Sequence, residues 1–216
     1  MDWEALIESQ PALAVIPPKL RELAARRDTE TGEMLFRLGD RLRDIFYVVA
    51  GEIRLVRRTR NGMDIVMQRS RGGFFAEASF NTKVYHCDAV VARPGAVLRF
   101  PAQAFRAALA TDVVFRNAWL VHLAHELLKS RARCERLGLK SAEQRIIHYI
   151  ESEGADGIVT LSESRKAWAA ELGLTHEALY RTLRRLQADG TLDIDADRII
   201  LSRRKKRTPP VTGSAS

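Results

Sequence analysis

The stretch SRKAWAAELGLTHEALYRTLRRLQADG, residues 164–190, has the pattern of two helices joined by a tight turn. Ala169 is small enough for two helices to cross closely, and Gly173 permits the left-handed backbone of the turn. Thr175 is a favourable N-cap for the second helix. The buried face of that helix is expected from leucines at helical spacing, namely Leu179, Leu183 and Leu186. The stretch therefore predicts a helix-turn-helix.

The exposed face of the second helix carries side chains that suit the edges of base pairs. Arg181 can make two hydrogen bonds to guanine, and Glu177 can accept one from cytosine. The residues predicted to contact DNA are Thr175, His176, Glu177, Tyr180, Arg181, Arg184, Arg165 and Lys166. The alternative is an ordinary helical hairpin with a solvated charged face.

The sequence after this motif predicts a β-hairpin wing and a basic run, GTLDIDADRIILSRR, residues 190–204, which we expect to lie against phosphates. The remaining tail, residues 205–216, is basic and then rich in Pro and Ser, so we expect it to be disordered. The net charge of +8 favours an anionic partner, either nucleic acid or a membrane surface. No apolar run approaches the length of a membrane span, no signal peptide is evident, and two cysteines fit a reducing cytosol. We therefore expect a cytoplasmic protein.

The region from about residue 33 to residue 100 has a β-rich texture. Short apolar runs such as IFYVVAG, EIRLV and AVLRF are separated by glycines, which predicts an antiparallel sandwich or roll. Asn61-Gly62 is a strong hairpin signal, because the turn it favours needs a positive φ at both positions. The preceding residues 2–28 are predicted to be helical, with Leu20, Leu23 and Ala24 at helical spacing.

A long helix is predicted over residues 112–137. It carries an a/d pattern that would form a dimer seam with a second copy of the helix, through Leu120, Leu123, Leu127, Ser130, Cys134 and Leu137. The alternative is a helix that packs on its own domain. Ser141 and Gln144 then form the pattern of a capping box at the start of the next helix.

The order of these parts resembles the cyclic-AMP receptor protein and fumarate–nitrate regulator (Crp/Fnr) family of bacterial transcription factors. The resemblance rests on FRLGDRLRDIFYVVAGEIRLV, NGMDIVMQRSRGGFFAE and THEALYR, which has the Glu-x-x-x-Arg of the family at Glu177 and Arg181. It implies an α+β chain with an N-terminal antiparallel β-roll, a long dimerisation helix and a C-terminal winged helix-turn-helix. The β-roll would be a cupin-like jelly roll of the cyclic-nucleotide-binding type.

The parts divide into a sensing domain (1–111), a dimerisation helix (112–138), a DNA-binding domain (139–204) and the tail (205–216). By resemblance, the chain is a regulator rather than an enzyme. It would form a homodimer on double-stranded DNA, with half-sites about 34 Å apart, and RNA polymerase would be a partner. A regulator that needs no effector is one alternative. A metal- or thiol-dependent enzyme or binding module is an alternative of another class.

The stretch FFAEASFNTKVYHCDAVVA, residues 74–92, stands where relatives that bind cyclic nucleotides have a phosphate-binding cassette. Ala76-Glu77 replaces the Gly-Glu of those relatives, and His86-Cys87 replaces their Arg-Ser. Since the arginine that clamps the phosphate is missing, we do not expect cyclic AMP to bind. The candidate effector residues are Glu77, Ala78, Ser79, His86, Cys87 and Ser130.

Several interpretations of this cassette remain open. It can be a pocket of altered specificity in which His86 and Cys87 only pack, a metal or haem site using both residues, or a thiol redox sensor. An iron–sulfur cluster of the [4Fe–4S] type needs four cysteines, and the chain has two. We therefore expect no such cluster.

Overall fold

The structure, a computed structural model, describes residues 1–58, 60, 64–161 and 164–202. It divides into two compact units, Met1–Glu126 and Leu127–Ser216. The helices are α1 (Trp3–Ser9), η1 (Pro11–Val15), α2 (Pro18–Glu22), η2 (Glu77–Ser79), α3 (Ala102–Thr111), α4 (Val113–Gly138), α5 (Ala142–Glu153), α6 (Arg165–Glu171) and α7 (His176–Ala188). The strands are β1 (Ala25–Thr29), β2 (Met34–Phe36), β3 (Asp44–Arg58), β4 (Asp64–Ser70), β5 (Gly73–Phe75), β6 (Asp88–Pro101), β7 (Ile158–Thr160), β8 (Leu192–Asp195) and β9 (Arg198–Leu201).

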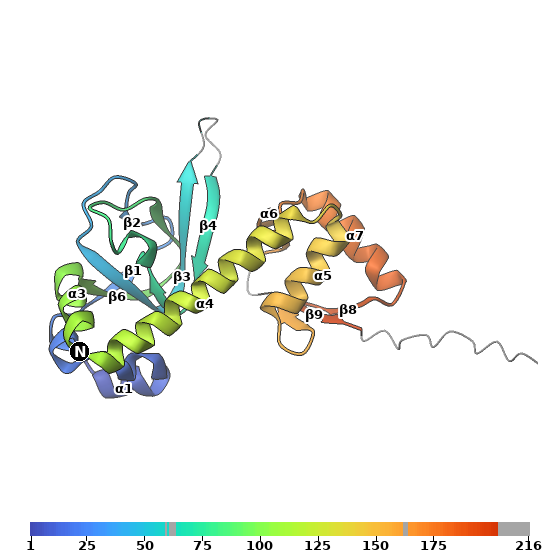
Figure 1. The fold of residues 1–216 in the computed structure, drawn as a ribbon. Helices are drawn as coiled ribbons and strands as arrows, with labels where there is room; N and C mark the ends of the chain where they lie inside the picture. The colour runs from blue at the N-terminus through green and yellow to red at the C-terminus, as the bar shows by residue number, and fades with distance from the viewer. Residues whose placement is uncertain (59, 61–63, 162–163, 203–216) are drawn as a thin grey trace, which may run out of the picture. The chain divides into compact units, whose positions relative to one another are not determined.

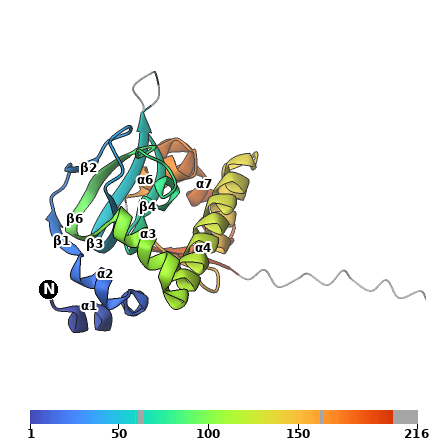
Figure 2. The same ribbon diagram turned by 60° about the vertical axis from the view of Figure 1, so that its left-hand side comes forward.

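The first unit is built on an antiparallel sheet in the order β1-β6-β3-β4, as Figures 1 and 2 show. The short strands β2 and β5 pair with β6 and β3. The predicted antiparallel β-rich fold is therefore confirmed. The predicted turn at Asn61-Gly62 lies outside the described residues, although β3 and β4 on either side of it pair antiparallel.

Strand β3 contributes to two separate apolar cores. Its first half turns Phe46 and Val48 into the interior of the roll, while Ile45 and Tyr47 face the helices. The pairing of β3 with β6 shifts register between Val48 and Ile53, and Gly51 in that interval has φ +89°. A Cβ at Gly51 would lie 2.6 Å from the carbonyl oxygen of Arg93. After this bulge the alternation is reversed, so Ile53 and Leu55 face the interior instead.

The N-terminal segment corrects one expectation. Residues 2–28 are not helical throughout, because the helices end at Glu22 and strand β1 begins at Ala25. Leu23, predicted to lie on a helix face, is 55% exposed. Residues 25–28 instead pair with β6, where Arg27 lies opposite Val97. Pairing with a strand distant in sequence therefore determines the secondary structure of this segment.

A core rich in aromatic rings joins the sheet of the first unit to its helices. Phe105 of α3 lies between Phe74, Phe100 and Trp119, with ring centroids 4.9–6.1 Å apart. Leu13 of η1 packs in the same cluster. Such pairs add to the free energy gained by burying apolar area. They hold α3 and the start of α4 against the sheet.

The second unit has a three-stranded sheet, β7-β9-β8, beside α5, α6 and α7. The predicted capping box at Ser141 and Gln144 is present at the start of α5. Trp168 is fully buried in the core of the unit. The predicted leucines of the second helix are buried too, namely Leu179, Leu183 and Leu186.

No helix among the described residues combines the length and apolar character that crossing a membrane requires.

Candidate functional site

The cassette begins with a strained backbone at Ala76. Ala76 has φ +69°, a left-handed conformation that glycine adopts more easily than alanine, and its side chain is buried. It is the N-cap of the single turn η2, which carries Glu77 and Ser79. The turn thus has the backbone of a glycine position, although the residue is alanine.

Glu77 connects the cassette to helix α4 through an amide. The Nε2 of Gln68 on β4 donates to Glu77 Oε1 (3.1 Å) and to Glu126 Oε2 (3.3 Å). Glu77 is 9% exposed. Sequence reasoning found Glu77 but missed Gln68 and Glu126, because the pairing of β4 and the packing of α4 bring them together.

His86 is bonded to Ser79 within the cassette. Their Nδ1 and Oγ atoms are 2.6 Å apart, and the backbone N–H of His86 also donates to Ser79 Oγ. Burial lowers the pKa of His86, and the nearby charge of Arg57 lowers it further. His86 is therefore neutral near pH 7 and supplies no positive charge for a phosphate.

Arg57 of β3 brings a guanidinium to the cassette that sequence reasoning did not foresee. Its Nε donates to the carbonyl oxygen of His86 at 3.0 Å, and the residue is exposed. Arg57 lies 29 residues before His86, so only the fold brings the two together. The cassette therefore combines the carboxylate of Glu77, a Ser–His pair and a cation from another strand.

Cys87 points into the roll, away from this polar group. It is 1% exposed and packs among the apolar side chains of the core. Burial, and secondarily the charge of Asp88, raises the pKa of its thiol to about 11. Cys87 and His86 therefore do not form a shared ligand set, because one faces the core and the other bonds Ser79. Among the described residues no group of three or more His, Cys, Asp and Glu is placed to hold a metal ion.

The other candidate effector residues are exposed. Ala78 lies in η2 with its side chain outward, and Ser130 is exposed on α4. Ser130 belongs to the second compact unit, and the structure assigns its side chain no hydrogen bond within the described part of the chain.

The outer face of α7 carries the predicted DNA-reading side chains. Thr175 caps the helix by accepting from the N–H of Ala178 (3.1 Å), as predicted. Glu177, Arg181 and Arg184 are exposed, and within the described part of the chain their side chains make no hydrogen bond or ion pair. They are available to an external partner.

The rest of the predicted interface is partly engaged inside the unit. The ring centroids of His176 and Tyr180 are 4.5 Å apart, and the guanidinium of Arg165 lies over the Tyr180 ring. Arg165 also donates to the carbonyl oxygen of Ala196 at the tip of the hairpin (3.0 Å). Lys166 is exposed. Arg165 therefore ties α6 to the hairpin, a role that the sequence did not reveal.

The turn between α6 and α7 is held by Arg145 of α5. Gly173 has φ +65°, as expected of the turn glycine. Arg145 Nη1 donates to the carbonyl oxygens of Leu172 (3.2 Å) and Gly173 (3.1 Å), and its Nε donates to that of Leu139 (3.0 Å). One side chain thus satisfies several carbonyl oxygens that the turn leaves without backbone partners.

The hairpin β8–β9 differs from the phosphate-binding wing we expected. Its exposed side chains include the carboxylates of Asp193, Asp195 and Asp197, with Arg198 as a cation. Carboxylates repel phosphates, so this hairpin is a poor phosphate contact. Most of the basic run that follows lies outside the described residues.

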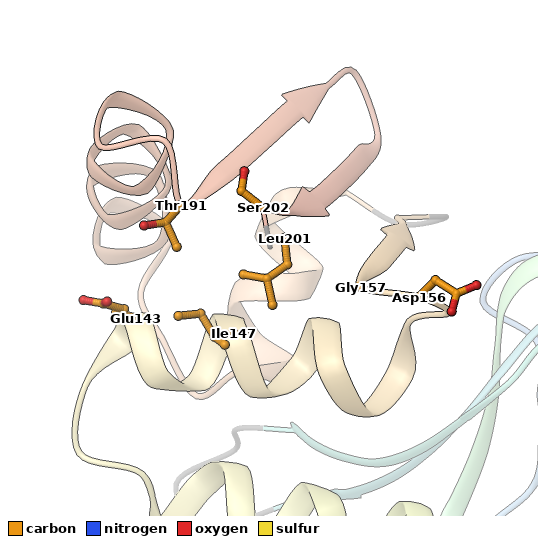
Figure 3. Close-up of a pocket in the computed structure, with 7 residues that line it drawn as sticks. All are labelled: Glu143, Ile147, Asp156, Gly157, Thr191, Leu201 and Ser202. Atoms are coloured by element: carbon orange, nitrogen blue, oxygen red, sulfur yellow. The ribbon is translucent and has the colours of Figure 1, made fainter. Parts of the chain in front are cut away.

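An open cavity of about 460 Å³ lies beside α5 and the hairpin, as Figure 3 shows. Ile147 and Leu201 give it an apolar side, and Glu143, Thr191 and Ser202 add polar groups. Glu143 is already paired with Arg185 (2.6 Å). None of the predicted DNA-reading residues lines this cavity.

The predicted seam on α4 has one member that also packs within its own unit. Leu123 is half-buried against the core of the first unit. Leu120 (57%) and Leu127 (53%) are exposed as the seam requires, and so are Ser130, Cys134 and Leu137. The large apolar side chains exposed on α4 recur in pairs seven residues apart: Val113 and Val114, Leu120 and Val121, Leu127 and Leu128.

Comparison with known proteins identifies one domain and the fold. Residues 26–112 match the cyclic nucleotide-binding domain family. FixK2 from Bradyrhizobium japonicum has a similar structure, with a TM-score of 0.68, 23% identity, and coverage of 84% of this chain and 93% of FixK2. No curated protein matches the chain.

Two further structures share the fold. The c-di-GMP-responsive global regulator CLP of Xanthomonas campestris has a TM-score of 0.62 and 20% identity, with coverage of 93% of this chain and 99% of CLP. A transcriptional regulator of the CRP family from Thermus thermophilus has a TM-score of 0.58 and 19% identity, with coverage of 81% of this chain and 91% of that regulator. The chain therefore has a cyclic nucleotide-binding domain. It has the fold of the Crp/Fnr regulators, which confirms the resemblance in its sequence.

Proposed function

We propose that this chain is a sequence-specific DNA-binding transcription regulator of the Crp/Fnr type and not an enzyme. The observation that carries the proposal is the outer face of α7, where Glu177 and Arg181 are exposed and make no hydrogen bond or ion pair within the described chain. A guanidinium and a carboxylate one helical turn apart suit direct readout of base edges in the major groove. The structures with this fold that are described as regulators support the same role.

The test is selection of DNA sites from a random pool, followed by affinity measurements on the selected duplex. Arg181→Ala should lose about 1–3 kcal/mol of affinity for the selected site and relax preference at one base pair. The exposed Lys19, in the first unit, gives a control, Lys19→Ala, that removes the same charge and should leave preference unchanged. If Arg181→Ala bound selected and random duplexes as the parent does, the recognition assignment would fail.

The regulator acts as a homodimer in this proposal. The paired apolar residues of α4, from Val113–Val114 to Leu127–Leu128, repeat every seven residues, which is the period of a two-helix seam. Leu120→Glu would place a charge in that seam, and a dimer would dissociate at micromolar concentration. Leu23→Glu, at an equally exposed leucine outside α4, is the matched control. Double-stranded DNA and RNA polymerase are its other proposed partners, and its place is the cytoplasm.

The signal is proposed to enter through the cassette, at Glu77, Ser79 and His86 with Arg57 beside them. The ligand is a small molecule other than cyclic AMP, because the arginine of the cyclic-nucleotide cassette is replaced by His86. Native mass spectrometry of anaerobically purified protein tests this. An added mass that Glu77→Ala and Ser79→Ala abolish would support a bound effector, and a bare dimer would favour the effector-independent regulator.

A further inference from the structure

A second cavity in the first unit is lined by basic side chains and by none of the proposed effector residues Glu77, Ser79 and His86. Its open volume is about 410 Å³. The buried rings of Phe36, Phe46 and Tyr85 form its floor. Its charged lining consists of two aspartates, Asp40 and Asp44, and four arginines: Arg27, Arg41, Arg43 and Arg99. We name this cavity the arginine pocket.

The strand pairing brings the four guanidinium groups together. Arg27 of β1 lies opposite Val97 of β6, two residues before Arg99, so Arg27 and Arg99 share one face of the sheet. Arg41 forms a bridge with Val84, and Arg43 follows two residues later just before β3. These arginines are up to 72 residues apart in sequence, which is why no local motif announced the pocket.

The charges of the pocket are only partly balanced. Arg27 is bonded to Glu33, and Arg99 Nε lies 3.6 Å from Asp44 Oδ2 without making a hydrogen bond. Arg41 and Arg43 make no side-chain hydrogen bond or ion pair with any residue that the structure describes. The lining therefore contains four cations and two carboxylates.

The two carboxylates of the lining differ in their surroundings. Asp40 accepts from the backbone N–H of Arg37 at 2.8 Å. Burial raises the pKa of Asp44, although Arg99 and Arg43 oppose that rise. Tyr85 fixes the neighbouring backbone, since its hydroxyl donates to the Asp44 carbonyl (2.8 Å) and accepts from the Asp44 N–H (3.1 Å). The floor of the pocket is thus rigid, while the guanidinium groups of Arg41 and Arg43 keep unused donors.

We propose that the arginine pocket binds a small polyanion of the phosphate class, such as a metabolite carrying a diphosphate. Guanidinium groups match phosphate oxygens with paired hydrogen bonds and remain charged at all physiological pH values. The volume lies in the range of small-molecule sites. A small ligand can lie within this cavity beside Arg99 and Tyr85, which both line it.

The site is distinct from the proposed effector residues of the cassette, and the proposal does not depend on them. None of Glu77, Ser79 and His86 lines the arginine pocket. Tyr85, however, belongs to its floor and immediately precedes His86. A polyanion in the pocket would therefore be a second input that contacts the same segment from its other side.

Calorimetric titration of the full-length protein with inorganic pyrophosphate, without DNA and at constant low ionic strength, tests the proposal. We expect saturable binding that Arg41→Gln/Arg43→Gln weakens by about tenfold or more. The double variant should fold, because both side chains are exposed and make no hydrogen bond or ion pair within the described chain. Lys19→Gln/Arg26→Gln removes the same charge elsewhere in the unit and should leave affinity unchanged. Arg181→Ala should also leave it unchanged, since α7 is not part of the pocket.

Further variants and ligands complete the test. Asp44→Asn removes the carboxylate beside Arg99 and should strengthen pyrophosphate binding severalfold. Weaker binding in that variant, or equal losses in the Lys19/Arg26 control, would overturn the proposal. Tighter binding of citrate than of pyrophosphate would overturn the phosphate class. Binding of a polyglutamate peptide with no binding of pyrophosphate would assign the face to an acidic protein and overturn it as well.

Discussion

The cassette and helix α7 use their polar side chains in opposite ways. In the cassette Ser79 bonds His86, and Glu77 shares the amide of Gln68 with Glu126. On α7, Glu177 and Arg181 extend from the surface without hydrogen-bond partners among the described residues. One region has turned its polar groups toward each other, and the other presents them outward. The difference fits the proposed roles: α7 presents polar groups to an external partner, while the cassette holds its polar groups against one another.

The largest effect is expected where the helix-turn-helix depends on one internal side chain. Arg145→Ala removes the donor that the carbonyl oxygens of Leu172 and Gly173 share, and should lower the free energy of unfolding by about 2–3 kcal/mol. Urea unfolding followed by tryptophan fluorescence, in a background where Trp3 and Trp119 are replaced by Phe so that Trp168 alone emits, measures it. Arg184→Ala, at an exposed site without hydrogen bonds or ion pairs within the described chain, should change stability by less than about 0.5 kcal/mol. Similar values for the two variants would show that α7 is positioned without Arg145.

A smaller effect is expected from the thiol of the cassette. Cys87→Ser would place a hydroxyl in an apolar cluster and should cost about 1–3 kcal/mol of stability, whereas Cys134→Ser should cost almost nothing. Since the pKa of Cys87 is raised to about 11, a thiol reagent at pH 8 should label Cys134 alone in the native protein. Rapid labelling of Cys87 would support the interpretation of the cassette as a thiol redox sensor.

The acidic hairpin gives a way to sharpen the DNA side of the comparison. The triple variant Asp193→Asn/Asp195→Asn/Asp197→Asn removes three charges that oppose phosphates, so affinity for random duplex DNA should rise about threefold to tenfold at low salt. Filter binding over a range of salt concentrations measures both the affinity and its slope.

The control for the hairpin removes three exposed carboxylates from the first unit, in Glu8→Gln/Glu22→Gln/Glu30→Gln. A gain in DNA affinity of the same size in that variant would show that net charge alone explains the effect. No gain in the triple aspartate variant would mean that the hairpin does not approach DNA.

The smallest expected effect concerns the proton equilibrium of His86. Burial and Arg57 both lower the pKa of His86, so Arg57→Gln should raise it toward the ordinary value. The native state binds this proton less readily than the unfolded chain does. The contribution of His86 to stability is therefore present above pH 6.5 and is lost as the pH falls through the native pKa. NMR titration of the imidazole resonances measures the pKa of His86. An unchanged pKa of His86 in Arg57→Gln would show that Arg57 does not act on the cassette.

Local patterns in the sequence predicted the parts of the fold that local interactions determine. The cap at Thr175, the turn at Gly173 and the capping box at Ser141 each depend on residues within four positions of one another. The glycine-separated runs likewise predicted the antiparallel sheet. These signals need no knowledge of distant partners.

The remainder depended on contacts between distant residues. Leu123 fits the heptad as well as Leu120 does, but it is half-buried against the core of the first unit, whereas Leu120 is exposed. Arg57 and Gln68 join the cassette because β3 and β4 reach across the roll. The local sequence of residues 25–28 predicts a helix, but their pairing with β6 makes them a strand. Sequence spacing contains none of these long-range choices.

The bulge at Gly51 has a consequence for how this chain tolerates length changes. The bulge reverses the alternation of β3, so even-numbered residues face the interior before it and odd-numbered residues face the interior after it. Deleting Gly51 would remove the residue that the bulge absorbs, so plain alternation from Val48 would again place Ile53 and Leu55 inside and the bulge would no longer be needed. An insertion of one residue near Ala50, with the bulge retained, would instead turn Ile53 and Leu55 to the outside, while paired insertions would restore the phase. At this point the first unit is thus sensitive to whether an insertion is odd or even, rather than to how large it is.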